Sequence, residues 1–460
     1  MSETIQQPKE KLSLFHLTWP IFLEIFLFML MGIADTFMLA AVSDDAVSGV
    51  GTANQYIHIA ILILEVVGNG AAIVVSQYLG SRRLIEATKI SALAISLNLV
   101  VGLIMSAIFV IFSSHLMIMM NLQGDVLTHA QGYLIIIGGG IFLQAIINSL
   151  AAIIRVHGQT KQTMYVSLGM NIIHVVGNYI LIFGHFGAPE LGVQGAAISS
   201  VISRLIAVFI FIWLYYQVLE IKVQWKNFIT FPKEYVKKIL AIGVPSALEQ
   251  IIYQVCQVVF LYYITYLGTE ALAARQYAVN ISMFTYLFAI AIGMGTSIIV
   301  GRLVGAGKQE EAYQQLWVSV KVAMIFTLIM VTVVTFFREA LMDVFTDNPE
   351  VIQLGVSVLL LSVLLETGRT INITIINTLR ATGDARFPVK IGFLSMVCMS
   401  LPLGYLLVFV LDMGLVGVWL AITADEWCRA IIVFFRWRGR KWERYSLVTP
   451  QKEKEVVESI

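Results

Sequence analysis

One carboxylate, Asp35, lies inside the apolar segment MGIADTFMLAAV, which runs from Met31 to Val42. A charged side chain at the middle of a bilayer costs at least about 2.5 kcal/mol on insertion scales, so it is usually kept where it faces a protein interior and has a function. We therefore expect Asp35 to bind a cation or a proton. A role in helix packing, as a buried and hydrogen-bonded side chain, is the alternative.

Three polar residues in a second apolar run are suited to join this carboxylate. Asn171, His174 and Asn178 recur at i, i+3 and i+7, so they share one face of a helix. One carboxylate with two amides and an imidazole can hold a proton, or a sodium ion on oxygen ligands at Asp35 and Asn178. The pattern leaves both ions open, and a buried histidine in an ordinary packing role is equally compatible with it.

The composition places these residues in a membrane protein. The 460 residues are 58% hydrophobic and 13% charged, about half the charge of a typical soluble domain, and the mean hydropathy is +0.84. The net charge of +1 gives no reason to expect nucleic acid as a partner, and nothing indicates a cofactor. The three cysteines lie in apolar runs and cannot all pair, so we expect no disulfide framework. The first apolar run lacks a cleavage site and is too long for a signal-peptide core, so we interpret it as the first span.

Twelve runs are near the roughly 20 residues that a helix needs to cross the hydrocarbon layer, which predicts an all-α polytopic membrane protein. Lysine and arginine concentrate in alternate connections, so the positive-inside rule predicts that both termini are cytoplasmic in a multi-pass protein of the cell membrane, and we expect a bacterial plasma membrane. The expected runs are 14–41, 52–80, 88–114, 131–155, 163–184, 192–218, 236–266, 277–305, 312–337, 350–380, 388–410 and 414–437.

The chain repeats itself without a gap, so that position n of the first half matches position n + 225 of the second. Pro20 and Glu24 match Pro245 and Glu249, and the correspondence continues as far as Arg204 and Arg429. Each half holds six runs, so the halves should insert in the same direction as two six-helix bundles related by a pseudo-twofold axis along the membrane normal. Parallel repeats of this kind occur in transporters, with the substrate path between the bundles.

The repeat divides the chain into five expected parts. They are a cytoplasmic segment 1–13, an N-lobe 14–218, a basic cytoplasmic linker 219–235, a C-lobe 236–437 and a cytoplasmic tail 438–460.

The repeat also separates the intramembrane charges into two kinds. The position equivalent to Asp35 is Phe260, so this carboxylate is specific to one half. Glu24 and Arg204 recur as Glu249 and Arg429, which favours a structural role, and we predict the ion pairs Glu24–Arg204 and Glu249–Arg429. A proton path from Glu24 to Asp35, three helical turns further along the same face, stays open.

The run 350–380 contributes a further acid and base. Glu366 and Arg369 are spaced i, i+3 within it and can meet on one helix face. Glu65, Asp425 and Glu426 are also expected inside the membrane, and the sequence assigns them no role.

Six segments at corresponding places in this duplicated frame resemble the multidrug and toxic compound extrusion (MATE) family. The resemblance covers residues 12 to 440 and implies an antiporter that exports organic, cationic or amphipathic compounds in exchange for H⁺ or Na⁺ by alternating access. It also implies that the aspartate of the G-x-x-D-T motif, here Asp35, couples transport to the cation. Some relatives have an acidic cation site in the C-lobe; here the nearest position is Arg369, which argues against sodium there. The segments are GIADTFMLAAV, VSQYLGSRR, VGRLVGAGKQEEA, MNIIHVVGNYILIFG, LGVQGAAISSVISR and NTLRATGDARFPV.

Two other classes of function compete with this one. An enzyme would need a catalytic motif, and H-E-x-x-H, G-x-S-x-G and P-loop patterns do not occur in the sequence, so we expect no enzymatic activity. A flippase for lipid-linked saccharides would need a cluster of basic residues for the diphosphate, whereas the intramembrane arginines are Arg204, Arg369 and Arg429. We expect small organic substrates, H⁺ or Na⁺, and the lipid bilayer as partners of a functional monomer.

The predicted topology has a direct test. A cysteine introduced at Lys226, in a background without the native cysteines, should react with a membrane-permeant maleimide and not with an impermeant one added outside intact cells, because the linker is expected in the cytoplasm. Modification by the impermeant reagent would show that the linker is outside the cell, and that the predicted orientation is wrong.

Overall fold

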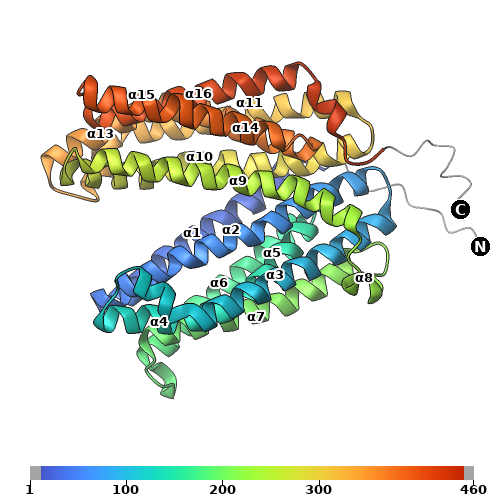
Figure 1. Ribbon diagram of the computed structural model, residues 1–460, viewed down its shortest axis with the longest axis horizontal. Helices are drawn as coiled ribbons and strands as arrows, with labels where there is room; N and C mark the ends of the chain where they lie inside the picture. Colours follow the sequence, from blue (N-terminus) through green and yellow to red (C-terminus); the bar gives the residue numbers. More distant parts are fainter. Residues whose placement is uncertain (1–11, 450–460) are drawn as a thin grey trace, which may run out of the picture.

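The computed structural model describes residues 12–449, and these fold into two helical bundles (Figure 1). Ten of the described helices are long and apolar enough to cross a membrane, and counting the bent pair α4 and α5 as one span makes eleven. The twelfth expected run is helix α16, which carries Asp425, Glu426 and Arg429 within its apolar part. The predicted segments 1–13 and 438–460 lie partly outside the described residues.

The first bundle runs from α1 to α7 and the second from α9 to α16, with the short α8 between them (Figure 1). The bounds in the first bundle are α1 Leu14–Ala40, α2 Asp44–Gly80, α3 Leu84–Met119, α4 Gly124–Gly139, α5 Ile141–Val156, α6 Thr160–Phe183 and α7 Gly192–Val218. Those that follow are α8 Lys226–Ile229, α9 Lys233–Thr265, α10 Thr269–Gly305, α11 Gln309–Phe336, α12 Arg338–Asp343, α13 Pro349–Thr382, α14 Arg386–Ser395, α15 Leu401–Tyr405 and α16 Gly414–Arg438.

Two expected spans are less regular than their hydropathy suggests. The run 131–155 is two helices, α4 and α5, that meet at Gly140 with a bend of 45°. The run 388–410 alternates α-helix with two π-helical turns, Met396–Ser400 and Leu406–Val410. Hydropathy measures how apolar a segment is and carries no signal for either break in regularity.

The bundles meet at the end where α1 and α9 begin and where α2 and α10 finish, which we call the basic end (Figure 1). A shared apolar core forms there, with residues of α1, α2 and α3 packed against α9 and α10. Val448, from the segment after α16, is buried in this core, and the Leu447 N–H donates to Gln77 Oε1 at 2.8 Å. Toward the end that carries α4, the two bundles diverge (Figure 1).

Hydrogen bonds across the basic end obey the pseudo-twofold symmetry. Gln77 Nε2 on α2 donates to the backbone oxygen of Ala381 at 2.7 Å, and Arg302 Nε on α10 donates to the backbone oxygen of Val156 at 3.1 Å. The donors Gln77 and Arg302 occupy equivalent places in the repeat, and so do the acceptors Val156 and Ala381. The repeat found in the sequence therefore relates these two contacts in space.

Two glycines allow helices α2 and α10 to cross with their backbones in contact. A Cβ atom added at Gly80 would overlap the backbone oxygen of Arg302, and one added at Gly305 would overlap that of Gln77. Gly80 and Gly305 are also equivalent in the repeat. A methyl group at either place would overlap a main-chain atom. Rotation of a side chain could therefore not relieve the overlap.

Gly80→Ala should therefore prevent α2 and α10 from approaching closely at the basic end. In a background without native cysteines, a cysteine at Ser76, which is buried at this crossing, should react with maleimide at least severalfold faster when Gly80 is alanine. Gly169→Ala is the matched control, since nothing lies within 4 Å of a Cβ atom at that helical glycine. Equal labelling rates in all three proteins would show that α2 and α10 do not need this close approach.

Candidate functional site

Asp35 lies in the second half of α1, about 30 Å from the start of the helix, on the far side from the basic end. Its side chain is 26% exposed. The same carboxylate oxygen, Oδ1, lies 2.7 Å from His174 Nε2 and 2.7 Å from Asn178 Nδ2, both on α6. The structure thus brings together three of the four residues that the sequence grouped.

The fourth residue, Asn171, is on the same helix face and is buried, but it is not hydrogen-bonded to the other three. Both polar atoms of its amide lack a hydrogen-bond partner among the described residues. Asn178 Oδ1 also has none within that part of the chain. Two amides on one face of α6 therefore offer oxygen atoms that no residue of the described range 12–449 uses.

Helix α7 supplies two partners that the sequence did not single out. Ser199 Oγ donates to the backbone oxygen of His174 at 2.8 Å, and Ser200 Oγ lies 3.2 Å from the ring nitrogen Nδ1. Ser200 thus contacts one ring nitrogen of the imidazole while the other faces Asp35, and Ser199 contacts the backbone of the same residue. The two serines stand side by side in the apolar run 192–218, and that adjacency was the available signal.

The arrangement can hold one proton in two ways. When Asp35 is ionised, a protonated Nε2 donates to the carboxylate; when Asp35 is protonated, the carboxyl group can donate to an unprotonated Nε2. Asn178 Nδ2 donates to Asp35 Oδ1 in both cases, since that contact, at 2.7 Å, is shorter than its 3.2 Å distance from Nε2. The hydrogen bond between Asp35 and His174 can therefore hold the proton on either group.

The predicted ion pairs are wrong, and the repeat contains the correct ones. Glu24 pairs with Arg155 at 3.1 Å, and Glu249 pairs with Arg380 at 2.7 Å. Arg155 and Arg380 are themselves equivalent in the repeat. Both stand in the last turn of a helix at the basic end, and their long side chains reach inward. Recurrence in the repeat suggested Arg204 instead, but recurrence does not say which face of α7 carries that residue.

Arg204 makes no ion pair within the described residues. Its Nη1 atom is buried without a hydrogen-bond partner there, and the nearby groups that act on its charge are Tyr133 and Asp35. The arginine therefore belongs to the surroundings of Asp35 rather than to those of Glu24.

Arg429, its counterpart, belongs to a buried charge network in the second bundle. Arg429 Nη2 contacts Asp425 at 2.7 Å and Glu426 at 3.1 Å, both on its own helix. Arg369 contacts Glu366 at 2.7 Å, as its i, i+3 spacing predicted, and lies 3.5 Å from Glu426. Asp425 and Glu426, which had no assigned role, thus provide the acids of this network.

The second bundle has apolar residues where the first has the Asp35 cluster. The positions equivalent to Asp35, Asn171, His174 and Asn178 are Phe260, Met396, Met399 and Leu403. Phe260 and Met396 are buried in one apolar core, with Leu403 packed against it. The polar site is therefore a property of one half, on a scaffold that both halves share.

Comparison with known proteins identifies the family. The MatE family model matches the chain twice, over residues 20–180 and 245–406. The chain belongs to the MATE family. The two matches begin at Pro20 and at Pro245, which the internal repeat makes equivalent. The protein is accordingly a membrane transporter and not an enzyme.

Two curated proteins and two solved structures show how far the similarity extends. The uncharacterized transporter YisQ of Bacillus subtilis is 39% identical, over 96% of this chain and 97% of its own. The probable multidrug resistance protein NorM of Thermotoga maritima is 27% identical, over 98% of this chain and 97% of its own. A crystal structure of MATE in the bent conformation superposes with a TM-score of 0.85 at 19% identity, over 93% of this chain and 94% of its own. The structure of an outward-facing multidrug resistance MATE transporter also superposes with a TM-score of 0.85 at 19% identity, over 93% of this chain and 95% of its own. The MATE fold has twelve spans, in agreement with the sequence prediction.

The corrected ion pair can be tested by a double-mutant cycle. Glu24→Gln and Arg155→Gln should each lower thermal stability in detergent, because each strands a charge that is largely buried. The double variant should be more stable than the sum of the two losses predicts, with a coupling of about 1 kcal/mol or more. Glu24→Gln combined with Arg204→Gln is the control and should be additive. If the stability losses at Glu24 and Arg204 were coupled and those at Glu24 and Arg155 were additive, the rejected pair Glu24–Arg204 would be correct.

Proposed function

We propose that this transporter exports organic, cationic or amphipathic compounds in exchange for protons by alternating access. The observation that carries the proposal is the Asp35–His174–Asn178 cluster, a carboxylate hydrogen-bonded to an imidazole and an amide inside a membrane-spanning bundle. Intramembrane carboxylates and histidines of this kind are typical of proton relays in transporters. Several relatives are named multidrug resistance proteins, which supports the class of substrate.

Orientation follows from charge. We propose that the basic end faces the cytoplasm, because lysine and arginine in short connections favour that side. Both termini and the linker 219–235 would then be cytoplasmic, between the lobes 14–218 and 236–437. The bundles contact each other at the basic end and diverge from it, so the described conformation would be open to the outside (Figure 1). One of the similar structures carries the name outward-facing.

Coupling can arise from a change of charge at one site. An ionised Asp35 attracts a cationic substrate, and a proton on Asp35 removes that attraction. A ligand shifts a conformational equilibrium only by its differential affinity for the two states. Proton binding from outside would thus release the substrate and favour closure, and loss of the proton to the cytoplasm would restore the substrate site.

A sodium ion is the second candidate for the coupling ion. Asp35 and the unpartnered oxygen of Asn178 could serve as oxygen ligands. The contact of His174 Nε2 with Asp35 favours the proton, because an imidazole that must donate to the carboxylate is a poor neighbour for a metal cation. The flippase alternative loses support, since the family match is to MatE.

Transport in proteoliposomes tests the coupling role of Asp35. A fluorescent organic cation should be driven uphill by an imposed proton gradient in the wild type. Asp35→Asn should reduce this by about tenfold or more, as expected for the loss of a coupling free energy of about 1 to 3 kcal/mol. Asp45→Asn, an exposed acid at the start of α2, should transport normally.

Two outcomes would contradict the proposal. Uphill export by Asp35→Asn at the wild-type rate would remove the coupling role from this residue. Export by the wild type under a sodium gradient, with no response to a proton gradient, would replace the proton with sodium.

A further inference from the structure

The two seams between the bundles are related by the repeat, and one of them is filled by aromatic side chains. Phe22 on α1 stacks on Phe288 of α10 with ring centroids 3.9 Å apart, and Phe288 stacks on Phe326 of α11 at 4.7 Å. Trp19 packs against both Phe22 and Phe288. These rings close the seam between the first bundle and helices α10 and α11.

The equivalent seam, between α9 and helices α2 and α3, has smaller side chains at the same places. Trp19, Phe22, Phe288 and Phe326 correspond to Val244, Ala247, Ile63 and Val101. A cavity of about 830 Å³ lies at this seam, within the size range of sites that bind small molecules. Its apolar lining comprises Leu97, Phe231, Val236, Leu240, Ala241, Val244 and Pro245.

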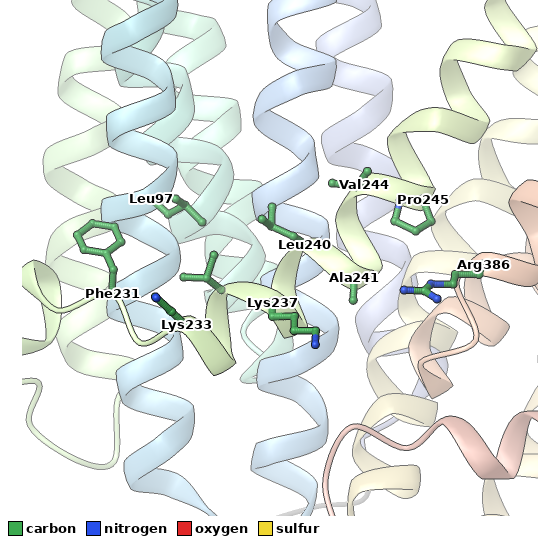
Figure 2. A pocket seen from close by; sticks show the side chains of 10 residues that line it. Leu97, Phe231, Lys233, Lys237, Leu240, Ala241, Val244, Pro245 and Arg386 are labelled. Atoms are coloured by element: carbon green, nitrogen blue, oxygen red, sulfur yellow. The ribbon is translucent and has the colours of Figure 1, made fainter.

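Three cationic side chains complete the lining at the basic end. Lys233 and Lys237 come from the first turns of α9 and Arg386 from the start of α14. All three are exposed, and none forms an ion pair with another described residue. In Figure 2 they lie across the middle of the view, with Leu240, Val244 and Pro245 above them.

The cavity thus changes from cationic to apolar along α9. From Lys233 to Pro245 the helix rises about 18 Å. Leu240 and Val244 are 36% and 42% exposed, so the apolar part opens toward the surroundings of the bundle. A ligand that fits must carry a negative group at one end and a flexible apolar part at the other.

We propose that this cavity binds an anionic phospholipid from the leaflet at the basic end. The phosphate would lie among Lys233, Lys237 and Arg386, and an acyl chain would occupy the space that Trp19 and its neighbours fill in the other seam. Basic pockets between helices at the cytoplasmic membrane surface suit anionic head groups. A free phosphate would make no use of the apolar lining, and a cationic substrate would be repelled by the three charges.

The lipid would also stabilise one conformation. Leu97 belongs to the first bundle, whereas Lys237 and Arg386 belong to the second, so the cavity exists as described while α3 and α9 are adjacent. A lipid bound here favours the arrangement in which the bundles meet at the basic end. This inference does not depend on which ion drives transport.

Lipid retention by the purified protein tests the site. After reconstitution in phosphatidylcholine vesicles with about 20 mol% phosphatidylglycerol as the anionic lipid, native mass spectrometry should find phosphatidylglycerol retained in preference to phosphatidylcholine. The triple variant Lys233→Gln, Lys237→Gln, Arg386→Gln should lose this preference, because each cation near a membrane surface contributes about fivefold to anionic binding. Val244→Trp, which keeps every charge and fills the cavity, should lower retention as well.

A matched control separates the site from general surface charge. Lys222→Gln, Lys226→Gln, Lys390→Gln removes three exposed cations outside the cavity and should retain phosphatidylglycerol as the wild type does. Equal losses in both triple variants would overturn the site. Full retention by Val244→Trp, or displacement of the lipid by millimolar glycerol phosphate, would show an anion site without a place for the acyl chain and would overturn the lipid assignment.

Discussion

The contact between the backbones of α2 and α10 at the basic end is the constraint on which the arrangement of the two bundles depends. Gly80 and Gly305 permit it, and the hydrogen bonds from Gln77 and Arg302 become possible once the helices are that close. The shared apolar core and the segment around Val448 then cover the crossing. Because main-chain atoms cannot move aside as side chains do, the contact is either made or broken, which suits the alternating access that we propose.

The two halves use the same arginine with different acids. Arg429 finds Asp425 and Glu426 on its own helix, whereas the equivalent neighbours of Arg204 are Ser200 and Val201. In the first bundle, Ser200 contacts His174, and the acid within range of Arg204 is Asp35 on another helix. In the second bundle the acids lie on the same helix as the arginine, whereas in the first the carboxylate lies on α1. The two charges of the first bundle are therefore further apart. Asp35 is partly exposed, as the proposed exchange of its ligand requires, while the acids of the second bundle are buried and paired.

Those features of the fold and the site that depend on apolar length, periodicity and repetition could be predicted from the sequence. The twelve helical runs, the grouping of Asp35 with His174 and Asn178, and the Glu366–Arg369 pair follow from such patterns. The partner of Glu24 did not, because helix rise gives the depth of a residue and says nothing about which neighbour its helix face meets. Arg155 lies at the end of an expected run, and its match with Arg380 in the repeat is the signal that could have made it a candidate partner of the glutamates. The bend at Gly140 and the role of Ser199 and Ser200 depend on packing between helices, which no single run encodes.

The crossing of α2 and α10 has a consequence for the origin of the chain. Gly80 meets the residue equivalent to Gln77, and Gly305 meets Gln77 itself, so the same patch of each half contacts its own copy. An interface with this reciprocity is isologous, the type that joins identical subunits around a twofold axis. A six-helix ancestor carrying this patch would already have been complementary to itself, and joining two of its genes would have turned a homodimer into one chain. Asp35 has no copy in the second half. A homodimer would carry such a residue twice, whereas a single chain can carry it once.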